Sequence, residues 1–173
     1  RKDNSENQNN LGLFPADKNH APYPVVLLLN GVNCNPNGYQ WLAEELALQG
    51  YLVVSFYLVS EIVPEVAGLS PGIDFRALTP DVVGTRPSCP TIAAALDLLD
   101  ELNKSGPLAG LIDTKTLFLG GHSGGGSMAL LNANTKWFPQ VKGVFTYAAH
   151  SGASVMLGYP KGTVLPLSNN VPV

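Results

Sequence analysis

The chain has 173 residues, of which 45% are hydrophobic and 13% are charged, and its formal net charge is -3. This size and composition predict one globular domain with a substantial core. The slightly acidic balance does not favour binding to nucleic acid or to an anionic membrane surface, and no apolar run is long enough to span a bilayer.

The sequence gives only weak signals of secondary structure near the N-terminus. Residues 1–10 are polar and rich in asparagine, which is typical of a loose or disordered end. Residues 11–14 could form a short strand, which Pro15 would end. We therefore assign residues 11–173 to the folded domain.

Strand and helix patterns then alternate along the chain. Residues 25–29 are a continuous run of valine and leucine, typical of a strand buried on both faces, and residues 52–57 predict a second buried strand. Between them, Pro36 marks a helix start, residues 39–49 carry the helix, and Gly50 ends it.

The second half of the domain continues this alternation after a less regular stretch. Proline and glycine break residues 58–90 repeatedly, and we expect this stretch to be irregular and to shape a substrate pocket. A helix over 91–103, a strand at 116–119, a helix at 127–131 and a last strand near 144–147 follow. The order predicts an α/β fold with a mostly parallel central sheet and helices on both faces.

The most informative motif is Gly-His-Ser-Gly-Gly-Gly at residues 121–126. Strand, G-x-S-x-G and helix in that order are the context of a nucleophile elbow, in which the serine sits at a strained apex. The motif predicts Ser123 as the nucleophile of a serine hydrolase, with an ordinary glycine-rich turn as the alternative. A phosphate-binding loop is disfavoured because no lysine follows Gly126.

An acyl-transfer site also needs donors for the oxyanion. One is expected from the backbone N–H of Gly124, the residue after the nucleophile. The second is expected from the loop after strand 25–29, with Val32 as the first candidate and Asn33 as the next. The alternative for this loop is an ordinary turn that ends the strand.

The chain has three histidines that could act as the general base. His122 precedes Ser123 and cannot fold back onto it, so we expect it to pack beside the elbow. His20 lies before the first core strand, at the wrong edge of the sheet. His150 follows the last strand at the carboxyl edge and has a geometric case, although a place in the pocket or in a loop is favoured for it.

Four further residues are of interest, two as aromatic side chains that could line a pocket and two as thiols. Tyr57, at the end of its strand, is a pocket candidate, whereas Trp41 is expected in the helix core more than in the pocket. Cys34 and Cys89 show neither metal-ligand spacing nor a C-x-x-C pattern, and we expect two free thiols. No residue pattern calls for a metal or an organic cofactor.

With these motifs the chain resembles the alpha/beta-hydrolase superfamily. Within it, the chain is most similar to the group of dienelactone hydrolase-like enzymes, cutinase-like polyester hydrolases and chlorophyllases. The elbow at 121–125 and the blocks at 24–31 and 41–54 carry this resemblance. Two residues depart from it: Asn30 stands where many relatives have histidine or proline, and Gly124 stands where chlorophyllases usually have arginine.

The resemblance implies a Ser–Asp–His triad in that chain order, with the acid and the histidine after the next two strands. Residues 171–173 look like the start of the strand that would carry the acid. We therefore expect the chain to be the N-terminal two-thirds of the fold, incomplete at its C-terminus. The triad aspartate and histidine would lie outside it, in a companion C-terminal segment of the same protein.

The expected activity is hydrolysis of a small-molecule or lipid-like carboxylic ester through an acyl-enzyme, with no cofactor. Other acyl hydrolases on the same fold remain alternatives, namely an amidase, a thioesterase or a phospholipase-type enzyme. A non-catalytic binding protein on a hydrolase scaffold is the alternative from another functional class.

Overall fold

A computed structural model of the chain describes residues 17–63, 65–167 and 170–173. The loose terminus expected at 1–10 and the short strand expected at 11–14 lie outside the described residues. Within the described ranges, no helix is both long enough and apolar enough to cross a membrane.

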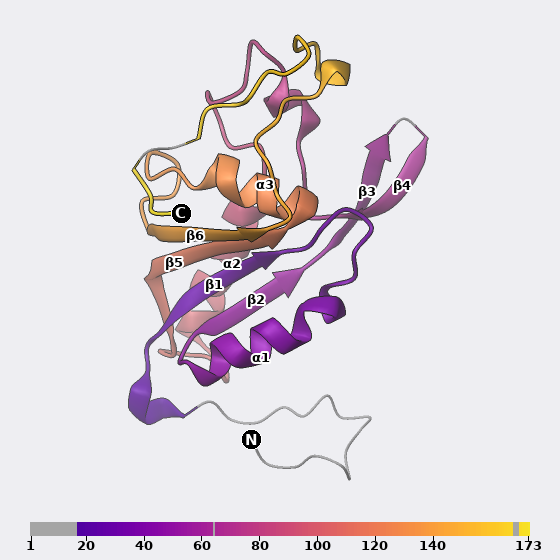
Figure 1. Ribbon diagram of the computed structural model, residues 1–173. Helices are drawn as coiled ribbons and strands as arrows, with labels where there is room; N and C mark the ends of the chain where they lie inside the picture. The colour runs from indigo at the N-terminus through magenta and orange to yellow at the C-terminus, as the bar shows by residue number, and fades with distance from the viewer. Residues whose placement is uncertain (1–16, 64, 168–169) are drawn as a thin grey trace.

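The centre of the fold is a four-stranded parallel sheet with the strand order β2-β1-β5-β6 (Figure 1). Strand β1 consists largely of apolar residues, and β5 is apolar at Leu117, Phe118 and Leu119, where it pairs with β1, as a sheet covered on both faces requires. The predicted α/β fold with a mostly parallel sheet is confirmed. The four strands are β1 (Tyr23–Leu29), β2 (Leu52–Phe56), β5 (Ile112–His122) and β6 (Val141–Tyr147).

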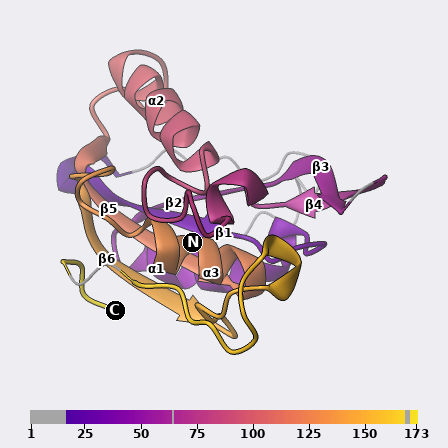
Figure 2. The same ribbon diagram turned by 90° about the horizontal axis from the view of Figure 1, so that it is seen from above.

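Helices cover both faces of this sheet. Helices α2 (Thr91–Lys104) and α3 (Ser123–Asn132) pack on the face that carries Leu27 and Leu29, because Ile92 and Met128 belong to the same buried cluster. Helix α1 (Gln40–Leu48) lies on the opposite side from α2, as the view along the sheet shows (Figure 2). The 3-10 turns are η2 (Lys18–His20), η3 (Pro36–Tyr39), η4 (Phe75–Leu78) and η5 (Val155–Leu157).

The start of α1 follows from local chemistry. The Asn35 side chain accepts a hydrogen bond from the Asn37 N–H at 2.9 Å, and Pro36 stands at the first position of η3, which leads directly into α1. Gly50, with φ of +91°, ends the helix region. The prediction that this segment is helical is therefore confirmed, although its first turn is a 3-10 turn.

Two predictions about strands need correction. The sequence predicts a buried strand at β2, but its residues are half-buried or exposed. Among the described strands, β2 lies at the edge of the sheet and pairs with β1 alone. The stretch 58–90 was expected to be irregular, but it contains an antiparallel hairpin of β3 (Leu58–Val63) and β4 (Val66–Ser70). The frequent proline and glycine residues of this stretch obscured the sequence pattern of two short strands, which contain three valines.

The C-terminal residues lie against β6 without forming a regular strand. The Val144 N–H in β6 donates a hydrogen bond of 3.0 Å to the Pro172 carbonyl, and Val171 is buried in the core. Residues 171–173 thus lie beside β6 but do not form the expected strand, because one hydrogen bond does not make a ladder.

We expect Leu27→Ala to lower the free energy of unfolding by about 2–5 kcal/mol, because Leu27 is fully buried between the register partners Val54 and Leu119. Urea denaturation measures this loss. The matched control is Leu48→Ala on α1, where the side chain is 69% exposed and the change should stay within about 0.5 kcal/mol. Equal losses for both variants would contradict the proposed core.

Candidate active site

Ser123 occupies a sharp strand-to-helix turn. Strand β5 ends at His122 and α3 begins at Ser123, four residues earlier than the sequence pattern predicts. The φ angle of Ser123 is +51°, which is uncommon and strained for a residue with a side chain. Such a conformation at this position is the geometry of a nucleophile elbow, which leaves the serine hydroxyl at the apex of the turn.

The glycines around Ser123 are required because a Cβ atom at these positions would clash with neighbouring atoms. A Cβ atom on Gly125 would lie 2.3 Å from the carbonyl oxygen of Asn30, and one on Gly121 would lie 2.6 Å from the carbonyl carbon of Gly125. A Cβ on Gly126 would lie 2.7 Å from the Cβ of Ala149. Strand β5, helix α3 and the end of β1 can therefore meet this closely only through bare backbone.

The loop after β1 lies directly against the elbow. A Cβ placed on Gly31 would be 3.3 Å from the Cβ of Ser123, and one placed on Gly124 would be 3.7 Å from the backbone nitrogen of Val32. The hydrogen bonds found among the described residues leave the Val32 N–H without an acceptor. The two backbone donors expected for an oxyanion, those of Val32 and Gly124, thus come from adjacent segments.

Asn33 is engaged elsewhere. Its N–H donates to the Leu69 carbonyl at 2.8 Å, and its Oδ1 accepts from the Leu69 N–H at 3.1 Å. Asn33 therefore attaches strand β4 to the loop, and its own N–H is not available as the alternative oxyanion donor. Sequence patterns missed this contact because the hairpin itself was missed.

His122 packs beside the elbow. Its Nδ1 lies 2.8 Å from the Tyr39 hydroxyl, and its ring contacts the rings of Tyr39 and Tyr147, each with a centroid distance of 5.7 Å. The same hydroxyl accepts a hydrogen bond of 3.2 Å from the Gly31 N–H. Partial burial raises the pKa of Tyr39. The tautomer of His122 decides which of the two groups donates in this bond. Tyr39 was not singled out in the sequence and connects η3 to both parts of the site.

Among the described residues, neither of the other two histidines forms a hydrogen bond with Ser123. His150 is exposed, and its Nδ1 accepts a hydrogen bond of 3.0 Å from the Gly152 N–H in its own loop. His20 belongs to η2, the turn before β1, and Figure 1 shows this turn at the amino end of β1. Across the described ranges, no histidine or carboxylate forms a hydrogen bond with Ser123.

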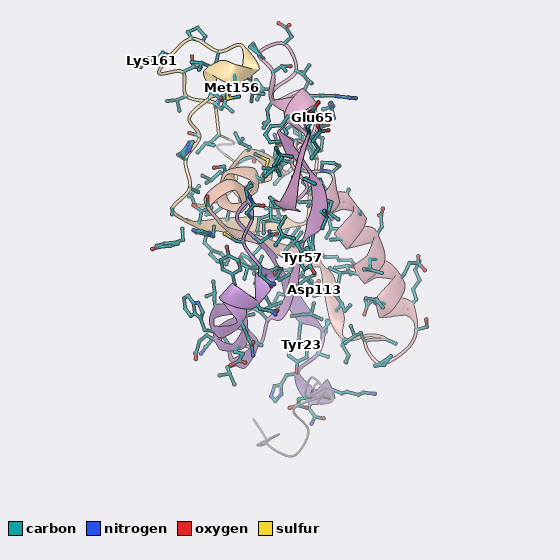
Figure 3. The ribbon with its side chains drawn as sticks, turned by 90° about the vertical axis from the view of Figure 1, so that its right-hand side faces the viewer. Tyr23, Tyr57, Glu65, Asp113, Met156 and Lys161 are labelled. Atoms are coloured by element: carbon teal, nitrogen blue, oxygen red, sulfur yellow. The ribbon has the colours of Figure 1, made fainter. Side chains whose placement is uncertain are left out.

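The aromatic pocket candidates are not gathered around Ser123. Tyr57 follows β2 and lines an open apolar groove of about 700 Å³ between β2 and α2, which Ser123 does not line. Figure 3 shows Tyr57 well apart from Met156 and Lys161 on the loop after β6. The expectation of a core position for Trp41 is wrong, because its side chain is 66% exposed on a helix that buries none of its residues.

Both cysteines are free thiols. Cys89 is buried, and this burial raises its pKa to about 11, so it stays protonated and unreactive at neutral pH. Cys34 lies near the elbow, since a Cβ on Gly31 would be 3.0 Å from its Sγ. Among the residues that the structure describes, no group of three or more histidine, cysteine or acidic side chains could hold a metal ion.

Comparisons with known proteins add a likeness to solved structures. No protein-family model matches the chain, and no curated protein matches it. Among solved structures, Thermogutta terrifontis esterase 2 phosphoramylated by tabun is similar to it, with a TM-score of 0.46 and 15% sequence identity. The match covers 88% of this chain and 54% of that chain, so this chain spans about half the length of that structure.

We expect Gly125→Ala to destabilise the protein by about 3 kcal/mol, because the new methyl group would overlap the backbone of Leu29 and Asn30, which cannot move aside as a side chain could. Thermal or urea unfolding measures the loss. Gly38→Ala is the matched control, since nothing lies within 4 Å of a Cβ at that position. If Gly125→Ala were as stable as Gly38→Ala, the close packing of α3 on β1 would be refuted.

Proposed function

We propose that the protein is a serine hydrolase that cleaves carboxylic esters, with Ser123 as the nucleophile. The observation that carries this proposal is the φ angle of +51° at Ser123, in a turn whose neighbouring glycines have no room for a side chain. This strain is not needed to join a strand to a helix, and it exposes one hydroxyl at the carboxyl edge of a parallel sheet, where the active sites of such folds lie.

The proposed reaction begins when Ser123 Oγ attacks the ester carbonyl carbon and a base accepts its proton. The carbonyl electron pair moves onto the oxygen, where the N–H groups of Val32 and Gly124 donate to the developing charge. The positive end of α3 adds to this stabilisation, because the helix begins at Ser123. The alcohol then leaves with the proton from the base, and water hydrolyses the acyl-enzyme by the same route in reverse.

The proposal of a base and an acidic partner follows from the resemblance to the alpha/beta-hydrolase superfamily, and no contact among the described residues supports it. We assign these roles to a histidine and an aspartate beyond the described residues, in a companion segment of the same protein. The mechanism needs neither a metal nor an organic cofactor. The proposed substrates are small-molecule or lipid-like esters, such as those of the cutinase-like and chlorophyllase group.

A second candidate is a non-catalytic binding protein on the same scaffold. One observation favours it: no histidine or carboxylate among the described residues is hydrogen-bonded to Ser123. This candidate predicts an unreactive serine, whereas the hydrolase predicts a serine that attacks electrophilic phosphorus.

We expect a fluorophosphonate probe to label the protein on Ser123, because an activated serine displaces fluoride from the probe and forms a stable phosphonyl ester. Intact mass followed by peptide mapping locates the label and also shows whether a second polypeptide accompanies the chain. Ser123→Ala should abolish labelling and lower hydrolysis of p-nitrophenyl butyrate by about 10⁴-fold or more.

The control for this experiment is Ser127→Ala, four residues further along the same helix, which should still be labelled. An unlabelled wild-type protein would refute the hydrolase and leave the binding protein. Labelling that persists in Ser123→Ala would refute Ser123 as the nucleophile.

We expect Val32→Pro to lower kcat for the ester by about 10²–10³-fold, because proline removes one oxyanion donor. Val32 precedes Asn33, whose φ angle is +57°, and Cys34 N–H closes the turn onto the Gly31 carbonyl at 3.0 Å. Proline is common at the second position of such a turn, so the backbone should be preserved.

Val32→Ala is the matched control, because it removes side-chain atoms but keeps the N–H. Steady-state kinetics should show kcat near wild type for Val32→Ala. Similar losses of kcat in both variants would show that the side chain of Val32, and not its backbone N–H, supports catalysis.

A further inference from the structure

We propose that Asn30 is a positioning residue that sets the direction of the Val32 N–H. Asn30 is fully buried at the end of β1, and its Nδ2 donates to the carbonyl oxygens of Gly31 at 2.9 Å and of Cys34 at 3.0 Å. One side chain thus holds both ends of the turn that carries Val32. The inference rests on the proposed function, because it concerns the donor assigned to the oxyanion.

The orientation of the Asn30 amide is determined by its partners. Both are carbonyl oxygens, which can only accept, so the NH2 group must face them and Oδ1 must face away. This Oδ1 is buried and has no hydrogen-bond partner among the described residues. An unpaired buried acceptor destabilises a fold, so stability alone does not account for an amide at this position.

Asn30 acts on the Val32 N–H through the peptide bond that joins Gly31 to Val32. In a trans peptide, the carbonyl of Gly31 and the N–H of Val32 point in opposite directions. When Asn30 and the Cys34 N–H hold the Gly31 oxygen on one side, the Val32 N–H must point to the other. Because a Cβ on Gly124 would be 3.7 Å from the Val32 nitrogen, the elbow lies beside this donor.

The opposite orientation of this plane would be harmful to the proposed reaction. A rotated peptide would present the Gly31 carbonyl oxygen where the oxyanion forms, which replaces an attractive donor by a repulsive acceptor. Glycine at position 31 has no Cβ to resist the rotation. The Tyr39 hydroxyl holds the preceding peptide through the Gly31 N–H at 3.2 Å, so Asn30 is the side chain that holds the peptide bearing Val32.

The test compares Asn30→Asp with Asn132→Asp. The first variant keeps the shape but replaces the NH2 donor by an acceptor. Asn132 is equally buried on α3 and donates from Nδ2 to the Met128 carbonyl at 2.8 Å, so its variant suffers a similar loss away from the loop. Asn30→Ala, which buries no charge, serves if Asn30→Asp does not fold.

Three readouts are measured on the full protein: the rate of Ser123 labelling by the fluorophosphonate, kcat and KM for p-nitrophenyl butyrate, and amide hydrogen exchange of residues 31–34. We expect Asn30→Asp to slow labelling and lower kcat by about 10–100-fold with little change in KM, and to speed exchange in the loop. Asn132→Asp should change none of the three by more than about twofold once both variants are folded.

Two outcomes would overturn the inference. One is labelling and kcat in both Asn30 variants that equal those of the wild type. The other is unchanged exchange of residues 31–34 in these variants, which can be measured even if the wild-type protein is not labelled at all. A failure of the hydrolase proposal and a failure of the role of Asn30 are therefore distinguishable.

Discussion

The close contact between helix α3 and the end of strand β1 is the constraint on which the rest of the structure depends. The backbone of Gly125 approaches the carbonyl groups of Leu29 and Asn30 so closely that no Cβ would fit. This contact brings the start of α3 to the carboxyl edge of the sheet. It also places the loop after β1 beside the elbow, so the strained Ser123 and the backbone of Val32 become neighbours although 90 residues separate them in the chain.

Hydrogen bonds from three other elements hold this loop in one conformation. Asn30 at the end of β1 bonds the two ends of the turn, Tyr39 in η3 bonds the Gly31 N–H, and Asn33 pairs with Leu69 of strand β4. A donor can stabilise a developing charge strongly only if it already points at the right place before the reaction. The same contacts couple the site to the β3–β4 hairpin, which projects beside it at the carboxyl edge (Figure 1).

Much of the fold could be predicted because its strands and helices carry strong local patterns. The apolar run at 25–29 and the spacing in 91–103 each specify an element in nearly the right place. The hairpin at 58–70 was missed because its short strands lie among proline and glycine residues. The exposure of β2 and of Trp41 was also missed, since burial depends on which elements lie at the edge of the sheet.

The sequence by itself determined the order of strands and helices, the elbow motif and the candidate nucleophile, because each depends on residues that are close in the chain. Only the tertiary structure decided that, among the described residues, the N–H of Asn33 has an acceptor and that of Val32 has none. It also decided that His150 makes a bond within its own loop, and that Tyr39 and Asn30 hold the loop after β1. The physical reason is that hydrogen-bond partners distant in sequence are chosen by the packing of β1, β4 and α3, which no local pattern encodes.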